Sequence, residues 1–109
     1  MSLTSKNAKN CEYIENGVMI SPNIPTVGEK IKISYDGLLA KSGATQVYAH
    51  VGYGSKWDGV CDYHMKKTKT GFEALIPVES SSTLNLCFKD AAGNWDNNSG
   101  KNYVFNVSH

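Results

Sequence analysis

Apolar and polar side chains alternate along several short segments of this chain, and a period of two is the repeat of a β-strand with one buried face. Clusters of Gly, Asn and Ser interrupt these segments about every ten residues, and no segment keeps a helical period. We expect strands near residues 17–21, 29–35, 45–53, 60–67, 71–78, 82–90 and 102–107. The pattern predicts an all-β fold, an antiparallel β-sandwich.

The apolar rows of these segments predict the core. Within each row the side chains point to the same side of the strand, so the rows together can fill the space between two packed sheets. The residues that we expect to be buried are Ile31, Ile33, Val47, Ala49, Val51, Phe72, Ile76, Leu84, Leu86, Phe88, Phe105 and Val107.

Length and composition indicate one globular domain. The chain has 109 residues, of which 40% are hydrophobic and 19% charged. We expect an N-terminal tail over residues 1–16 and the folded module over residues 17–109. One interpretation of Met1-Ser2-Leu3 is a cloning remnant, and the polar segment 1–7 has no apolar stretch of the kind that signal peptides carry.

Charge and cysteine usage exclude several classes of function. The net charge is +1, and all eleven basic residues are Lys, whereas nucleic-acid binding relies on Arg and on a basic excess. No apolar run approaches the roughly 20 residues of a membrane helix. Cys11, Cys61 and Cys87 have no Cys-x-x-Cys spacing, which excludes a zinc cage or a dense disulfide framework. Their pairing stays open between free thiols and one bridge.

Two aromatic side chains outside the core rows could contact a ligand. His50 alternates with Ala49 and Val51, so it faces outward, either as an ordinary exposed histidine or as a hydrogen-bonding group on a binding face. Trp57 lies in the Gly-rich loop 52–59. There it either covers one end of the core or binds a ligand.

A second tryptophan, Trp95, lies among small and polar residues in the segment 90–100. It is either a structural plug or an aromatic platform rimmed by amide and carboxylate groups. Sugars present apolar C–H patches on their ring faces and hydroxyl groups at their edges. A flat indole beside Asn and Asp side chains satisfies both, so the platform fits better than the plug.

Metal binding and catalysis lack the residues that they need. Residues 94–98 alternate as in a calcium loop, but Ser99 and Phe105 stand where that loop requires Gly and Glu. Asp62 and His64 supply only two ligands. Glycoside hydrolysis needs two carboxylates that face each other across a cleft, and the acidic residues here are scattered. We expect no enzyme activity, no metal and no cofactor.

With these positions identified, the sequence resembles the starch-binding carbohydrate-binding modules of family 25 and their relatives in family 53. Three pieces within residues 29–107 carry the resemblance. They are Val47-Tyr48-Ala49-His50 followed by Trp57, the strand Leu84-Asn85-Leu86-Cys87-Phe88-Lys89-Asp90, and Asn94-Trp95-Asp96-Asn97-Asn98 followed by Gly100-Lys101-Asn102-Tyr103.

The resemblance implies an immunoglobulin-like topology and non-catalytic binding of α-1,4-glucans or malto-oligosaccharides. Such modules are attached to secreted amylases and related enzymes, so it also implies an extracellular location and a catalytic domain as partner. His50, Trp57 and Trp95 would form the sugar platform, and Asn97 or Asn98 would supply hydrogen bonds. We expect a monomer.

Two other functions stay open beside glucan binding. One is a structural or adhesive immunoglobulin-like spacer without a sugar site, and the other is a small enzyme. Exposed indoles that share one face favour binding, and buried indoles favour the spacer. The loops of Trp57 and Trp95 leave opposite ends of a simple sandwich. One shared site therefore requires residues 91–101 to fold back over the outer sheet face that carries His50.

Overall fold

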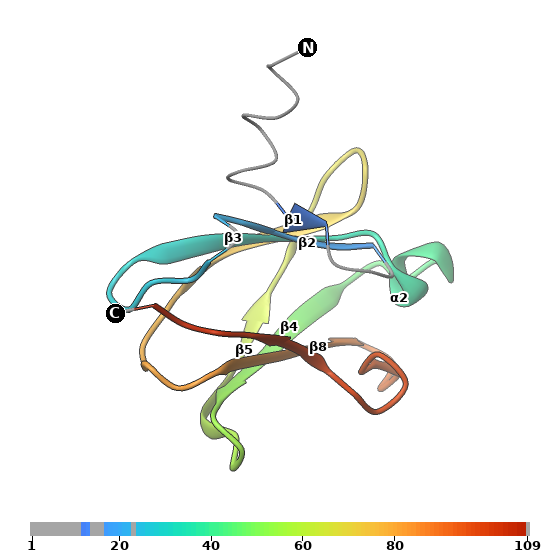
Figure 1. Cartoon of the computed structure of the whole chain (residues 1–109). Coiled ribbons are helices and arrows are strands. Elements are labelled where there is room, and N and C mark those ends of the chain that lie inside the picture. Colours follow the sequence, from blue (N-terminus) through green and yellow to red (C-terminus); the bar gives the residue numbers. More distant parts are fainter. Residues whose placement is uncertain (1–11, 14–16, 23, 109) are drawn as a thin grey trace.

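The computed structural model describes residues 12–13, 17–22 and 24–108. They form two sheets that pack face to face (Figure 1), and every pair of strands within a sheet is antiparallel. The predicted antiparallel β-sandwich is confirmed. The immunoglobulin-like topology implied by the family resemblance is a finer statement and stays a prediction.

The first sheet has the strand order β1 (Glu12–Tyr13), β2 (Val18–Ser21), β3 (Lys30–Tyr35), β7 (Phe72–Pro77) and β6 (Lys66–Lys67). The second has the order β10 (Tyr103–Phe105), β8 (Leu84–Asp90), β4 (Val47–Tyr53) and β5 (Asp58–His64), and β9 (Trp95–Asp96) also pairs with β8. The short strand β1 falls within the segment expected to be a tail.

The core lies between the sheets, where the apolar rows predicted it. Of the residues expected to be buried, all are at most 7% exposed except Val107, which is partly buried. Tyr35 and Tyr103 join them at 1% exposure. The alternation succeeds because each strand presents one row of side chains to the opposite sheet. On β8 the outer row is also buried, at Asn85 and Cys87. No helix in the described ranges is long and apolar enough to cross a membrane.

The prediction of one strand over residues 60–67 is wrong. The segment is divided between β5 in the second sheet and β6 in the first, and Met65 marks the crossing. Met65 is 1% exposed, and its backbone N–H donates to the carbonyl oxygen of Val47 at 2.9 Å. A residue buried where the chain changes sheets continues the apolar pattern, so the period alone cannot mark the break. One helical turn, α2 (Leu38–Lys41), was also not predicted, because it is too short to show a period.

Two of the three cysteines fall within the described residues, and both are free thiols. Cys61 is exposed on β5, whereas Cys87 is buried on β8. Burial raises the pKa of Cys87 to about 11, so its thiolate is scarce at neutral pH. Cys11 lies outside the described residues.

Candidate functional site

His50 lies in the middle of the outer face of the second sheet. Its strand neighbours Ala49 and Val51 are buried, whereas the His50 side chain is 24% exposed. The outward orientation predicted from the alternation is therefore confirmed. In the sheet register, His50 is opposite Asp62 on β5 and Cys87 on β8.

Trp57 reaches this face because the turn between β4 and β5 folds back over Gly52. A Cβ atom at Gly52 would lie 2.6 Å from Cε3 of Trp57, so glycine leaves the room that the indole occupies. The buried side chain of Asn85 donates to the carbonyl oxygen of Gly54 at 2.7 Å and holds the turn. Trp57 itself has a φ of 56°, a left-handed conformation that bulky residues rarely adopt. Such local strain persists only where the surrounding structure fixes it.

Replacing Gly52 by Ala is expected to displace Trp57 and to weaken any ligand binding that uses it. The φ angle of Gly52 is not in the left-handed region, so the backbone at this position accepts Ala. What remains is the clash with Trp57, whose Cε3 would lie 2.6 Å from the new Cβ and whose Cα and Cβ would lie 3.2 Å from it. We expect a several-fold loss of affinity for maltoheptaose, with a loss of about 1 kcal/mol in the free energy of unfolding, as overpacking at a yielding site costs. Calorimetric titration measures the affinity, and urea denaturation measures the free energy of unfolding. Unchanged affinity would show that the indole position is not needed.

Trp95 arrives at the same face from the opposite end of the sheet. The structure places it not in a loop, as the sequence predicted, but in β9, where it pairs with Lys89 of β8. β9 and β10 both pair with β8, at Phe88–Lys89 and at Leu84–Leu86. The chain after β8 thus turns back along this strand, and the Trp95 side chain is 48% exposed.

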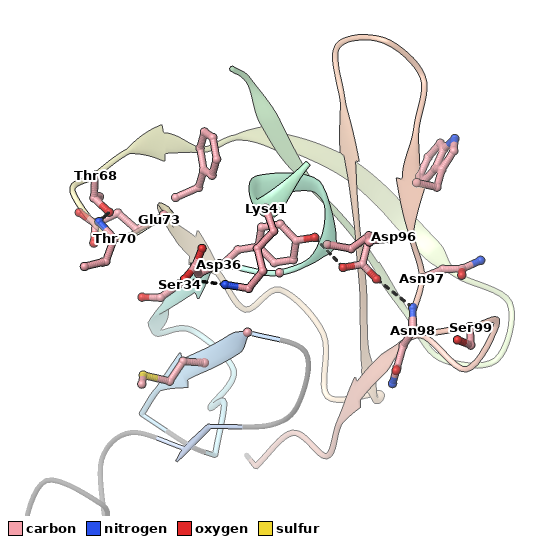
Figure 2. A pocket seen from close by; sticks show the side chains of 18 residues that line it. Ser34, Asp36, Lys41, Thr68, Thr70, Glu73, Asp96, Asn97, Asn98 and Ser99 are labelled. Carbon is pink, nitrogen blue, oxygen red and sulfur yellow. Dashed lines mark hydrogen bonds and ion pairs between the residues drawn. The ribbon is translucent and has the colours of Figure 1, made fainter. Parts of the chain in front are cut away.

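Asp96 holds β9 in place by hydrogen bonds to the protein interior. The sequence analysis did not identify this role. Asp96 is 6% exposed, and its carboxyl oxygens accept hydrogen bonds from the hydroxyls of Tyr35 at 2.5 Å and Tyr103 at 3.2 Å. The backbone N–H of Asn98 also donates to it at 3.3 Å, as Figure 2 shows. Burial and the hydrogen bond to Asp96 raise the pKa of Tyr35 well above its ordinary value. The period of two, Trp95 outward and Asp96 inward, was the available signal, but a run of polar residues hid it.

These placements bring three aromatic rings together. The ring centroid of His50 lies 5.6 Å from that of Trp57 and 5.2 Å from that of Trp95. The two loops leave opposite ends of the sheet, and His50 stands midway between the tryptophans. Residues 91–101 thus do fold back over the face that carries His50, as a shared site requires.

The two predicted asparagines, Asn97 and Asn98, have different surroundings in the structure. Asn97 is exposed and lines a shallow pocket of about 300 Å³ with the three rings. Asn98 does not line this pocket, and its side-chain amide donates to the carbonyl oxygen of Asn102 at 3.1 Å. Asn98 therefore stabilises the 97–102 loop, and Asn97 is the better placed to meet a ligand on the rings.

A carboxylate and an ammonium group complete the face. Asp62 accepts a hydrogen bond from Nδ1 of His50 at 2.5 Å, and its other oxygen lies 2.7 Å from Nζ of Lys89. Burial raises the pKa of Asp62, but the hydrogen bonds from Lys89 and His50 outweigh it and hold the pKa below its ordinary value. Asp62 is therefore charged at neutral pH. The sequence does not predict this pair, because Asp62 and Lys89 lie on β5 and β8, which are separated by β4. The Lys89 side chain reaches across β4 to Asp62.

A cleft with a volume of about 810 Å³ lies beside the aromatic rings. Figure 2 shows it between Ser34, Thr70 and Glu73 on one side and Asn97–Ser99 on the other, with the Asp36–Lys41 ion pair at 3.5 Å between them. Trp95 and Asn97 line both spaces. We place the candidate site on the rings rather than in the cleft, because the flat apolar surfaces that a sugar ring stacks on are there.

Comparison with known proteins assigns the chain to a family. Residues 31–86, slightly more than half of the chain, match the model of family 53, described as a starch/carbohydrate-binding module. The chain belongs to this family. The matched span of this family 53 module contains His50, Trp57 and Asp62 and ends before Trp95. Membership of family 25, the other part of the expected resemblance, is not confirmed by this match.

One curated relative is an alpha-amylase of Clostridium acetobutylicum, to which the module is 38% identical over 82 residues. The alignment covers 73% of the module but 10% of the amylase, so the chain spans about a tenth of the length of that relative. No solved structure matched the chain.

Proposed function

We propose that this module binds starch-like α-1,4-glucan on a sugar platform formed by His50, Trp57 and Trp95, without catalysing a reaction. Asn97 supplies hydrogen bonds at the edge of the platform, and Asn98 contributes by holding its loop. The observation that carries the proposal is the gathering of three rings on one outer face, where the centroid of each indole lies within 5.6 Å of that of His50. Stacking on these rings covers the apolar faces of the sugar, and the polar rim meets its hydroxyl groups.

The inclination of the rings favours a curved glucan. His50 is tilted by 31° to Trp57 and by 89° to Trp95, so the two indole planes differ by at least 58°. Successive sugars of a flat chain such as cellulose need nearly coplanar rings. An α-1,4-glucan turns from one residue to the next, so its sugars can meet two inclined faces.

The exposure of the rings argues against the spacer alternative. A module that only separates two domains has no use for a tryptophan that is 48% exposed, because indole in water is costly. The deep core is complete without either tryptophan, since neither belongs to the cluster of buried residues.

The biological role that follows is to hold an amylolytic catalytic domain at the polysaccharide. The similar segment of the Clostridium acetobutylicum protein belongs to an alpha-amylase that is about ten times longer than the matched region. A tethered module raises the local concentration of the catalytic domain at insoluble polymer. This role places the module outside the cell, as a monomer within its parent protein.

Gel electrophoresis in the presence of polysaccharide tests the ligand class. Migration of the module should be retarded by amylopectin or glycogen and not by hydroxyethylcellulose. Affinity for short malto-oligosaccharides should be modest, with a Kd on the order of 10 µM to 1 mM, because sugars exchange good hydrogen bonds with water for similar ones with protein. Equal retardation by the cellulose derivative would refute the specificity, and no retardation by any polymer would refute the sugar site.

A further inference from the structure

Four side chains from four strands of the outer face form a closed circuit of contacts. Nδ1 of His50 on β4 is 2.5 Å from Asp62 on β5, and Asp62 is 2.7 Å from Nζ of Lys89 on β8. That Nζ lies over the ring of Trp95 on β9, 5.4 Å from its centroid. The edge contact of 5.2 Å between Trp95 and His50 closes the circuit. Asp62 therefore contacts one ring, Lys89 contacts the other, and the two charged groups contact each other.

We propose that Asp62 and Lys89 are positioning residues of the sugar platform, which set the hydrogen-bonding state of His50 and the orientation of Trp95 before a ligand binds. The inference rests on the proposed function for its ligand. Neither charged side chain belongs to the pocket that the rings share, and together with Trp95 both line a neighbouring pocket of about 490 Å³. The role assigned to them rests on their direct contacts with His50 and Trp95.

Asp62 determines the tautomer of His50. An ionised carboxylate can only accept hydrogen bonds, so in the neutral imidazole the proton stays on Nδ1. Nε2 then carries a lone pair and can accept a hydrogen bond from a sugar hydroxyl. Without Asp62, the proton could occupy either nitrogen and the acceptor would be present only part of the time.

Lys89 acts on both Trp95 and Asp62. The cation over one face of the indole is attracted by the electrons of the ring and restrains the orientation of a side chain that is otherwise half exposed. Its charge also balances Asp62, and both groups are only partly exposed, at 29% and 36%. Lys89 reaches Asp62 across β4, so it couples the orientation of one ring to the tautomer of the other. Restraining side chains in advance lowers the cost of ordering them on binding.

Nuclear magnetic resonance of the unliganded module tests the positioning without a sugar. Long-range ¹H–¹⁵N spectra should show His50 protonated on Nδ1 in the parent module and redistributed toward Nε2 in Asp62→Ala. Lys89→Met should shift the indole N–H resonance of Trp95, and Lys89→Arg should restore it. Asp58→Ala removes a carboxylate from the same strand, and Lys30→Met removes an ammonium from the other sheet, so both controls should leave these signals unchanged.

Calorimetric titration with maltoheptaose then measures the consequence for binding. Asp62→Ala and Lys89→Met should each weaken affinity about tenfold. The double variant should be hardly weaker than either single one, because the two residues act as a unit. Thermal unfolding of each variant checks that the fold is retained.

The outcomes separate this inference from the proposed function. If the parent module binds no glucan, the proposed function fails, and the spectra still decide whether the charged pair sets the two rings. If His50 keeps its tautomer in Asp62→Ala, or if affinity is unchanged while the spectra change, the positioning role is overturned.

Discussion

Replacement of Trp95 by Ala is expected to abolish measurable glucan binding while the module stays folded. Trp95 is the most exposed of the aromatic rings on the platform and lines the pocket that they share. Loss of an aromatic anchor at a binding surface typically costs about 2 kcal/mol or more, which corresponds to about thirtyfold in affinity. A starting Kd between 10 µM and 1 mM then rises to roughly 0.3–30 mM, so retardation in amylopectin gels should be almost completely lost.

Stability should respond little to the same change, because the Trp95 side chain is already 48% exposed. We expect the melting temperature of Trp95→Ala to fall by a few degrees, whereas truncation of a buried tryptophan costs about 3–5 kcal/mol.

Trp57→Ala should weaken binding in the same direction, and His50→Ala more mildly, since it removes a smaller ring. Leu75→Ala, an exposed apolar residue on β7 in the first sheet, is the matched control. Normal amylopectin binding by Trp95→Ala, or its unfolding, would show that the site is elsewhere.

The part of the structure that the sequence predicts well is the part governed by the period of two. Ile31 and Ile33, or Leu84 and Leu86, alternate with residues of the opposite face, and a buried sheet face has no other pattern available. The prediction over 60–67 fails where that rule loses information. Met65 stays buried while the chain passes from one sheet to the other. The period of two carries no information about which sheet a strand joins.

The aromatic candidates could be chosen from the sequence, but their meeting could not be predicted from it. An indole in a polar segment stands out by composition, and His50 by alternation. Their approach depends on tertiary features: the missing Cβ of Gly52, which admits one indole, and the buried Asp96, which holds the strand of the other. Such features act between segments far apart in the chain, so local pattern gives them no signature.

Replacement of Asp96 by Ala is expected to destabilise the module strongly and to weaken glucan binding at the same time. The hydroxyl groups of Tyr35 and Tyr103, both 1% exposed, donate to this carboxyl group. Loss of a buried partner costs about 1–3 kcal/mol for each donor. The Tyr35 hydroxyl also accepts a hydrogen bond from the backbone N–H of Leu39 at 3.0 Å, so the helix α2 loses support as well. We expect the free energy of unfolding in urea to fall by about 3 kcal/mol and the melting temperature by about 15 °C.

A double-mutant cycle with Tyr35→Phe separates the lost hydrogen bond from other effects of the Asp96 change. Because Asp96 and Tyr35 are direct partners, the loss in the double variant should be clearly smaller than the sum of the two single losses. Glucan binding should also be weakened, because Asp96 lies next to Trp95 in β9 and faces the interior. Tested well below its own melting temperature, Asp96→Ala should stay folded and yet bind amylopectin weakly, because the strand that carries the indole has lost its anchor. Full retention of amylopectin binding in a destabilised Asp96→Ala would mean that β8 alone holds Trp95 in place.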